Sequence, residues 1–270
     1  MYGIIGNEIS YSASPRIHQS IAKLHKRKIN YSLWDISPAA FSEKIPKLIT
    51  RLQGANVTTP YKSQILPFLN FISDEARMTE SCNTIYRHNN QLIGTNTDIA
   101  GVIATLKSQI PDAQQFYPII FGSGGAARAV LQALTNLEIK EASLLSRGGK
   151  IISWLKTKFP KIELNGLPDK FHRQTLWINA SPLGGPKNPE FTLIREHLER
   201  FNQPGDYFFD LNYQPKNNPL QSYADSLKMT VINGWHMLIY QALAAHQLWF
   251  PNEDWNNFPV QNLMKEINYE

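Results

Sequence analysis

Short runs of β-branched and aromatic residues alternate with longer stretches of helical periodicity along most of the chain. This alternation is typical of parallel sheets covered by helices, so we predict an α/β fold. Before the midpoint, residues 84–87 and 91–94 flank a short polar turn and predict a β-hairpin. The other predicted strands are Tyr2–Ile5, Tyr31–Ile36, Gly54–Val57, Ile119–Phe121, Ser143–Ser146, Leu176–Asn179, Tyr207–Leu211 and Thr230–Ile232.

The chain is longer than one typical domain. It has 270 residues, against the roughly 100–200 of most domains, so we expect two domains. Residues 98–110 have a helical pattern that ends before Pro111, which predicts a connecting helix. We place the domain boundary at this helix.

Composition narrows the class of protein. Apolar residues make up 42% and charged residues 18%, which excludes a disordered or collagen-like chain. The 27 Lys and Arg residues exceed the 22 Asp and Glu residues by five, without a long basic block, so we expect no nucleic-acid partner.

The cysteine, histidine and apolar patterns point to a reducing compartment and no membrane. The single cysteine, Cys82, excludes an internal disulfide, and the seven histidines have no zinc-ligand spacing. No signal peptide is visible, and the longest apolar stretch, residues 237–250, is too short and too polar to span a bilayer. We therefore predict a cytoplasmic protein without a metal or a membrane partner.

A glycine-rich turn follows the predicted strand that ends at Phe121. The residues Gly122, Ser123, Gly124, Gly125 and Ala126 stand between this strand and a helical pattern. Glycine at 122 permits a tight turn, glycine at 124 lets the backbone approach a pyrophosphate, and small Ala127 takes the position where the helix packs on the strand. The pattern predicts dinucleotide binding at the helix N-terminus, with a plain glycine-rich turn as the structural alternative.

The end of the next strand bears on which dinucleotide binds. An acidic residue there would bind the ribose 2′-hydroxyl of NAD, but this chain has Ser146, Arg147 and Lys150. A guanidinium suits a 2′-phosphate, and Ser146 and Lys150 could add donors, so we predict NADP as the cofactor. The alternative is a solvated cationic loop.

Two serine- or threonine-proline segments suggest a second site. Ser12 and Ser14 precede Pro15 and a helical pattern, which predicts a helix capped by Ser14 and a place for a carboxylate, although Ser-Pro also starts many helices. Thr58 is followed by Thr59-Pro60, which predicts another helix with Lys62 in its first turn. A lysine there opposes the helix dipole, which is understandable if it exchanges protons and is steadied by a carboxylate. Asp98 is the candidate partner, and it could also cap the helix that follows it.

Together these segments resemble the shikimate dehydrogenase family. The resemblance covers nearly the whole chain in order. The segments that carry it are Ser12-Ala13-Ser14-Pro15, Asn56-Val57-Thr58-Thr59-Pro60-Tyr61-Lys62, Cys82-Asn83-Thr84, Asn96-Thr97-Asp98, the glycine turn, Asn179-Ala180-Ser181-Pro182, Asp210-Leu211-Asn212-Tyr213, and Gly234-Trp235-His236-Met237-Leu238 with Gln241.

The resemblance implies an NADP-dependent oxidoreductase that reversibly reduces 3-dehydroshikimate to shikimate, in the chorismate pathway of aromatic amino-acid biosynthesis. It implies a small-molecule substrate and a monomer or homodimer. The implied fold is an amino-terminal α/β substrate domain near residues 1–100, a Rossmann NADP-binding domain near 101–232, and carboxy-terminal helices at 233–270 that complete the first domain. The active site would lie between the domains.

The resemblance also implies roles for single residues. Lys62 and Asp98 would form the catalytic pair, with Lys62 supplying a proton to the substrate oxygen. The substrate carboxylate would be held by Ser12, Ser14 and Tyr213, and the ring with its hydroxyls by Thr58, Asn83 and Gln241. Besides the glycine turn, the residues that would contact the cofactor are Ser146, Arg147, Lys150, Ser181, Gly234 and Met237.

The chain departs from the family pattern at a few positions. Ser146-Arg147-Gly148 stands where the family commonly has Asn-Arg-Thr, and His236 stands near the nicotinamide where glycine is common. Two alternatives stay open: a quinate/shikimate dehydrogenase that uses NAD or NADP, and a cofactor-sensing protein that has lost its chemistry.

Overall fold

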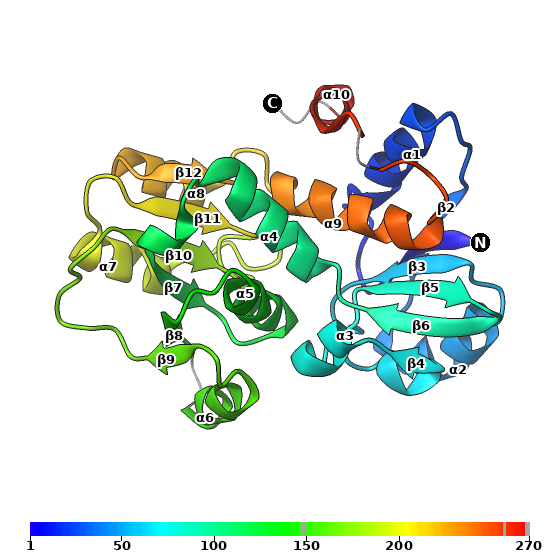
Figure 1. Ribbon diagram of the computed structural model, residues 1–270, viewed down its shortest axis with the longest axis horizontal. Coiled ribbons are helices and arrows are strands. Elements are labelled where there is room, and N and C mark those ends of the chain that lie inside the picture. The colour runs from blue at the N-terminus through cyan, green and yellow to red at the C-terminus, as the bar shows by residue number, and fades with distance from the viewer. Residues whose placement is uncertain (147–148, 256–257, 268–270) are drawn as a thin grey trace. The chain divides into compact units, whose positions relative to one another are not determined.

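The computed structural model describes residues 1–146, 149–255 and 258–267 (Figure 1). The chain forms two compact units, one of Met1–Gly101 with Ile239–Glu270 and one of Val102–Leu238. Each unit contains its own six-stranded sheet with helices packed on it. The α/β class predicted from the alternating pattern is confirmed.

The sheet of the first unit has the strand order β2-β1-β3-β5-β6-β4. Strands β1, β2 and β3 are parallel, β5 and β6 form an antiparallel hairpin beside β3, and β4 pairs parallel with β6. The strands are β1 (Tyr2–Gly6), β2 (Tyr31–Asp35), β3 (Gly54–Val57), β4 (Phe71–Ile72), β5 (Thr84–His88) and β6 (Gln91–Thr95).

Both faces of this first sheet are covered, as the neighbouring residues Ile4 and Ile5 of β1 illustrate. Successive strand side chains point to opposite faces. Ile4 therefore belongs to a cluster with Trp249, and Ile5 to a separate cluster with Phe41. The helices of this unit are α1 (Ser14–Leu24), α2 (Pro38–Ile49), the 3₁₀ helix η1 (Leu66–Phe68), α3 (Asp74–Thr79) and α10 (Val260–Glu266). Helices α4 (Asp98–Gln109) and α9 (Trp235–Trp249) each belong to both units, because the chain passes from one unit to the other within them.

The second sheet is parallel throughout, with the order β12-β11-β10-β7-β8-β9. Numbered by appearance in the chain, this is the doubly wound order 3-2-1-4-5-6 of the Rossmann fold. The central strands β7 (Tyr117–Phe121) and β10 (Thr175–Asn179) are buried at every residue. The remaining elements are η2 (Ala113–Gln115), α5 (Gly125–Asn136), β8 (Glu141–Leu145), α6 (Gly149–Lys158), β9 (Glu163–Asn165), α7 (Thr192–Phe201), β11 (Tyr207–Asp210), α8 (Pro219–Ser226) and β12 (Thr230–Ile232).

The predicted strands all form, within two residues at each end. The hairpin is confirmed, with Asn89 and Asn90 at φ of 48° and 61° in its turn, a left-handed conformation that asparagine tolerates. Strands β4 and β9 were not predicted, because two or three residues are too few to show a period.

The helix predicted after Thr59-Pro60 is wrong. Residues 59–65 form consecutive turns, followed only by η1, and the Thr59–Pro60 peptide is cis. Pro67 lacks an N–H donor and disfavours a helical conformation at the residue before it, so the two prolines leave too few residues for an α-helix. Lys62 therefore lies in a turn, and the argument from an opposing helix dipole does not apply to it.

The predicted cap of α1 is also wrong. Ser14 is the first helical residue and Ala13 precedes it as the N-cap, without a side-chain cap bond. The Ser12 hydroxyl accepts a hydrogen bond from the Ser14 backbone N–H at 3.2 Å, so Ser12 supplies the local acceptor expected of residue 14.

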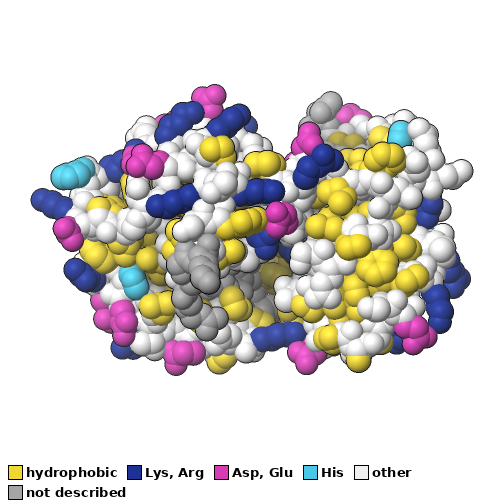
Figure 2. All heavy atoms as spheres, turned by 90° about the horizontal axis from the view of Figure 1, so that it is seen from below, with side chains coloured by type: hydrophobic (Ala, Val, Ile, Leu, Met, Phe, Trp, Pro, Cys, Tyr) yellow, Lys and Arg dark blue, Asp and Glu magenta, His cyan; other side chains and the backbone are white. Residues whose placement is uncertain are grey.

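Within the part of the chain that is described, no helix is long and apolar enough to cross a membrane. On the face that Figure 2 shows, basic and acidic side chains are interspersed, in keeping with the small charge excess.

Candidate active site

Several chain segments meet at one edge of the first sheet. Strands β1 and β3 are parallel, so the residues that follow them leave at the same edge. The antiparallel pairing of Asn56 with Thr84, and of Thr84 with Thr95, brings the start of β5 and the end of β6 to that edge too. This topology gathers residues 7–14, Thr58–Lys62, Asn83 and Asn96–Asp98, which include most of the residues predicted to bind substrate.

Lys62 and Asp98 form an ion pair at this edge. Lys62 Nζ donates to Asp98 Oδ2 at 2.5 Å, and the side chains are 22% and 8% exposed. The backbone of Lys62 is fixed because its carbonyl accepts from the Cys82 N–H at 2.7 Å. Asp98 is the first residue of α4, where the helix dipole favours a carboxylate. The sequence proposed this pairing, and the geometry brings the two groups together.

Asn83 connects the carboxylate to two further groups. Its amide Nδ2 donates to Asp98 Oδ1 at 2.6 Å and to Gln241 Oε1 at 3.4 Å. Its Oδ1 accepts from the backbone N–H of Thr97 at 2.6 Å. The predicted residues Asn83 and Gln241, 158 positions apart in the chain, therefore lie beside the ion pair. Both oxygens of Asp98 are thereby held.

A buried network lies behind these groups, and sequence reasoning gave it no role. Asn56 Nδ2 donates to the Asn83 carbonyl at 3.3 Å and to Thr84 Oγ1 at 3.1 Å, and Asn56 Oδ1 accepts from Tyr31 Oη at 2.7 Å. Thr84 Oγ1 and Thr97 Oγ1 are 2.7 Å apart. These residues are at most 5% exposed. The position of Asn56 within a strand was the available signal, since a buried amide there requires partners.

The remaining predicted substrate residues of the first unit are Ser12, Ser14 and Thr58. Ser14 is 5% exposed and sits at the start of α1, whereas Ser12 and Thr58 are half-buried. The backbone N–H of Thr58 donates to the Ile5 carbonyl at 2.9 Å, which ties the end of β3 to β1. Ser12 and Ser14 lie at the N-terminus of α1, where a carboxylate is favoured, and Thr58 follows the end of β3.

The glycine turn of the second unit has the geometry expected of a phosphate-binding turn. Gly122 adopts φ +117°, and a Cβ there would lie 2.7 Å from the carbonyl oxygen of Ala180. A Cβ at Gly124 would meet nothing within 4 Å. Helix α5 begins at Gly125, and Ala127 is fully buried against the sheet. The turn thus leaves open space in front of a helix N-terminus.

These features fit a dinucleotide. The backbone N–H groups of the first turn of a helix bind phosphate oxygens, and the turn lies after β7, beside the loop after β10, where the strand order reverses. Ser123, Gly125 and Ala126 belong to this turn and the first turn of α5. Ser146 Oγ donates to Ser123 Oγ at 2.8 Å, which brings the end of β8 next to it.

The predicted 2′-phosphate contacts cannot all be placed. Arg147 and Gly148 lie outside the described residues, and so does the side chain of Lys150, although its backbone belongs to α6. The NADP preference therefore stays a prediction from the sequence at these positions.

The other predicted residues of the second unit lie at the carboxyl ends of its strands. Ser181 follows β10 and donates through Oγ to Asn179 Oδ1 at 2.6 Å. Tyr213 follows β11 and its ring lies edge-on to Trp235, with centroids 5.2 Å apart. Gly234 precedes α9, and a Cβ there would lie 2.2 Å from the Leu211 carbonyl oxygen. Met237 is 8% exposed on α9.

Two other features carry no site chemistry. Burial raises the pKa of the Cys82 thiol to about 12, so this cysteine is not a nucleophile at neutral pH. Among the described residues, no group of three or more His, Cys, Asp or Glu side chains could hold a metal ion.

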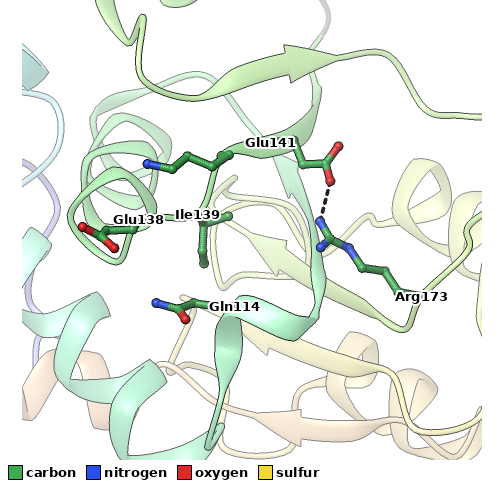
Figure 3. A pocket seen from close by; sticks show the side chains of 6 residues that line it. Gln114, Glu138, Ile139, Glu141 and Arg173 are labelled. Atoms are coloured by element: carbon green, nitrogen blue, oxygen red, sulfur yellow. Dashed lines mark hydrogen bonds and ion pairs between the residues drawn. The ribbon is translucent and has the colours of Figure 1, made fainter.

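A hollow of about 230 Å³ lies at the opposite, amino-terminal ends of the second sheet's strands (Figure 3). Of the four charged residues that line it, Glu141 and Arg173 form an ion pair at 2.7 Å. Because open parallel sheets bind ligands at the carboxyl ends of their strands, this hollow is not the candidate site.

Comparison with known proteins gives a consistent result. Residues 4–85 match the family model described as the shikimate dehydrogenase substrate binding domain. A shikimate dehydrogenase (NADP(+)) from Clostridium botulinum is 34% identical over 254 residues, which cover 93% of this chain and 96% of the relative.

Solved structures of shikimate dehydrogenases are similar to this chain over nearly its whole length. Shikimate dehydrogenase 1 from Peptoclostridium difficile superimposes with a TM-score of 0.81 at 28% identity, covering 98% of each chain. Shikimate 5-dehydrogenase from Thermus thermophilus, in complex with NADP(H) and shikimate, has a TM-score of 0.83 at 24% identity, covering 99% of this chain and 98% of the other, which by itself supports the fold alone.

Proposed function

Because this chain belongs to the shikimate dehydrogenase family, we propose that it catalyses the reversible, NADP-dependent reduction of 3-dehydroshikimate to shikimate. The observation that carries the proposal is the contact of Lys62 Nζ with Asp98 Oδ2 at 2.5 Å, flanked by Asn83 and Gln241. A lysine and a carboxylate held this closely can deliver and recover a proton. A binding protein without chemistry has no need of such a pair.

Lys62 acts on the ketone oxygen of the substrate. NADPH, when bound, supplies the hydride that reduces the ketone carbon. As negative charge grows on the oxygen, the Lys62 ammonium stabilises it and donates a proton. Asp98 holds the ammonium in position and accepts a hydrogen bond from a neighbouring substrate hydroxyl. In the reverse direction Lys62 takes the proton from the alcohol.

The polar residues around this pair bind the substrate. Asn83, Gln241 and Thr58 hydrogen-bond the ring hydroxyls, and Ser12, Ser14 and Tyr213 hold the carboxylate. The support is that the N-terminus of α1 and two hydroxyl-bearing segments lie at the same sheet edge as Lys62. The domain roles follow: the first unit binds substrate and the second binds cofactor.

The glycine turn and the adjacent strand ends hold NADP. The N-terminus of α5 and the open space at Gly124 suit the pyrophosphate, and Ser181, Gly234 and Met237 supply further contacts. Ser146, Arg147 and Lys150 bind the 2′-phosphate. The proposed location is the cytoplasm, since NADPH and free thiols belong to the reducing interior of the cell. The proposed oligomeric state is a monomer or a homodimer.

The test is a spectrophotometric assay of the purified protein with shikimate and NADP⁺, following the absorbance of the reduced nicotinamide. Turnover with shikimate and little turnover with quinate supports the proposal. A higher kcat/KM for quinate identifies a quinate/shikimate dehydrogenase instead. Binding of NADP⁺ without turnover of either compound would mean that the protein is a sensor, and the proposal would fail.

A further inference from the structure

The second unit contains a buried carboxylate to which the proposed mechanism gives no role. Asp210, the last residue of β11, is 0% exposed. Its Oδ1 accepts from Asn179 Nδ2, from the Asn212 backbone N–H and from Asn212 Nδ2, each at 3.0 Å. Its Oδ2 accepts from Asn218 Nδ2 at 3.1 Å and from Gln221 Nε2 at 3.0 Å. All of these donors are neutral amides.

The side chain of Asn179 links Asp210 to the loop after β10, because Asp210 fixes which way its amide points. With Nδ2 directed to Asp210, its Oδ1 accepts from the backbone N–H and the hydroxyl of Ser181, at 3.1 and 2.6 Å. An amide has a donor end and an acceptor end, so fixing one end fixes the other. The place of Ser181 thus depends on the acceptor at residue 210.

Asn212 acts in the same way on two loops. Besides Asp210, its Nδ2 donates to the carbonyls of Ser181 and Leu183, both at 3.2 Å. Its own carbonyl accepts from the Gly234 N–H at 3.3 Å and from Gln221 Nε2 at 3.1 Å. Tyr213 is the next residue. The loops after β10, β11 and β12 are therefore joined through groups that contact one carboxylate.

These loops have little room to adjust. A Cβ at Gly234 would lie 2.2 Å from the Leu211 carbonyl oxygen, and one at Gly185 would lie 2.8 Å from Asn212 Oδ1. Because Gly234 packs this closely on the Leu211 backbone and Gly185 on the Asn212 side chain, a change in the orientation of the Asn179 or Asn212 amide shifts the loops themselves.

We propose that Asp210 is a positioning residue of the ligand-binding edge of this unit. By accepting from the surrounding amides it holds in register the loops that present Ser181, Tyr213 and Gly234 to the cofactor and substrate. This inference rests on the proposed function of those three residues. An acceptor-only carboxylate is required at this position, because an amide would direct an N–H group at the partner donors.

The principal test replaces Asp210 by asparagine, which keeps the size but changes one acceptor into a donor. The dissociation constant of NADP⁺ is measured by isothermal titration calorimetry, and KM and kcat with shikimate are measured in parallel. We expect the Kd for NADP⁺ and the KM for shikimate to rise about 10- to 100-fold, the range expected when a buried hydrogen-bonding group loses its partner.

The chain offers a matched control in Asp206. It is also 0% exposed and borders the same strand, but at the amino end, where it accepts from the Thr175 N–H at 2.7 Å and the Gln203 N–H at 2.9 Å. Asp206→Asn should lower the melting temperature as Asp210→Asn does and leave the Kd for NADP⁺ within about twofold of wild type. This comparison separates positioning of the loops from a general loss of stability.

If Asp210→Asn does not fold, Gln221→Met provides the test. Gln221 is half-buried, and methionine keeps its length while removing the donors to Asp210 and to the Asn212 carbonyl. A smaller rise of the NADP⁺ Kd is then expected. Unchanged Kd and KM in a folded Asp210→Asn protein, or in Gln221→Met where that is the variant measured, overturns the inference. A wild-type protein that binds NADP⁺ but turns over no shikimate would instead contradict the proposed function.

Discussion

The two units each bury an aspartate among amide side chains, but with different surroundings. Asp98 in the first unit accepts from Asn83 and from the Lys62 ammonium, which is partly exposed. Asp210 in the second unit accepts from the neutral amides of Asn179, Asn212, Asn218 and Gln221 and is fully buried. The comparison teaches that a buried carboxylate paired with a partly exposed ammonium suits proton transfer, whereas one saturated by neutral amide donors suits positioning.

The two units also differ in how acid affects them. The first unit buries His246, and burial, aided by the nearby His25 and Arg27, lowers its pKa to about 3. The neighbouring His18 is fully buried with its pKa also lowered by burial, and its ring stacks on Tyr31. In the second unit, burial raises the pKa of Asp210 to about 6, against the opposing effect of hydrogen bonds from Gln221, Asn212 and Asn179.

The largest effect should come from removing the cation of the first aspartate. Lys62→Ala leaves Asp98 with the amide of Asn83, so its surroundings become more like those of Asp210, and kcat should fall about 100- to 10,000-fold. The Kd for NADP⁺, measured by calorimetry, should stay unchanged. Lys23→Ala is the control, since Lys23 also pairs with a carboxylate, Glu266 at 2.6 Å, but is 75% exposed. Near-native turnover of Lys62→Ala would remove Lys62 from the mechanism.

The next largest effect should come from the residue of the second unit that is proposed to bind the 2′-phosphate of NADP. The proposed function assigns the 2′-phosphate of the cofactor to the cationic residues after β8. Arg147→Ala should raise the KM for NADPH about 10- to 100-fold, the value of one or two lost charge-assisted hydrogen bonds. The KM for NADH should change little. Equal changes for both cofactors would contradict the assignment of Arg147.

Because the pKa of His246 is lowered and that of Asp210 is raised, the two groups change the free energy of unfolding in opposite directions as the pH changes. Below about pH 6.5 an unfolded histidine binds a proton that buried His246 does not, so its contribution is lost as the pH falls, by at most about 1.4 kcal/mol per pH unit. Asp210 has a raised pKa, so its contribution is present below pH 3.8 and is lost as the pH rises through about 6.

Urea unfolding of wild type and His246→Phe between pH 7.5 and pH 5 measures the first of these contributions. Phenylalanine keeps the ring among Trp249 and Phe250, and His246 Nε2 is buried without a hydrogen-bond partner among the described residues. The free energy of unfolding should fall less steeply toward pH 5 in the variant. Parallel curves for the two proteins would show that His246 does not titrate differently on unfolding.

The smallest effect concerns the network behind Asp98. Tyr31→Phe removes the donor to Asn56 Oδ1 and should lower stability by about 1 kcal/mol, with kcat reduced less than about tenfold because Asn83 is held less firmly. Tyr61→Phe is the matched control, since the buried Tyr61 hydroxyl donates to the Ile36 carbonyl at 2.5 Å, outside this network. If both variants lose the same stability and neither changes kcat, the network only stabilises the fold.

Local patterns made much of this architecture predictable. Strand periodicity, the glycine turn and the Asn89-Asn90 turn are properties of neighbouring residues, and the structure agrees with the sequence there. The pairing of Lys62 with Asp98 was proposed from chemistry, but the reason given, a lysine in the first turn of a helix, was wrong. The turns between Pro60 and Pro67 carry the lysine instead.

The networks could not be predicted because they depend on register between strands that are distant in sequence. The place of Asn56 within a strand indicates that its amide needs partners, but nothing local identifies them as Tyr31 on β2, two strands away, and Thr84 on the adjacent β5. Asp210 likewise belonged to a family-like segment, yet its role appears only when Asn179 and Gln221 are brought to it by the sheet and by α8. At the start of α1 the N-cap is Ala13, and the Ser14 N–H bonds the Ser12 hydroxyl, an arrangement that residue preferences alone do not decide.

The two glycines of the turn after β7, Gly122 and Gly124, are suited to their places for different reasons. At Gly122 the backbone excludes a side chain for two reasons. Its φ is +117°, and a Cβ there would lie 2.7 Å from the Ala180 carbonyl oxygen. At Gly124 the folded protein itself has room for a methyl group, at φ −78° with open space around it. If this turn binds the cofactor as proposed, substitutions at residue 122 should impair folding and ligand binding alike, whereas substitutions at residue 124 should leave folding intact and impair ligand binding.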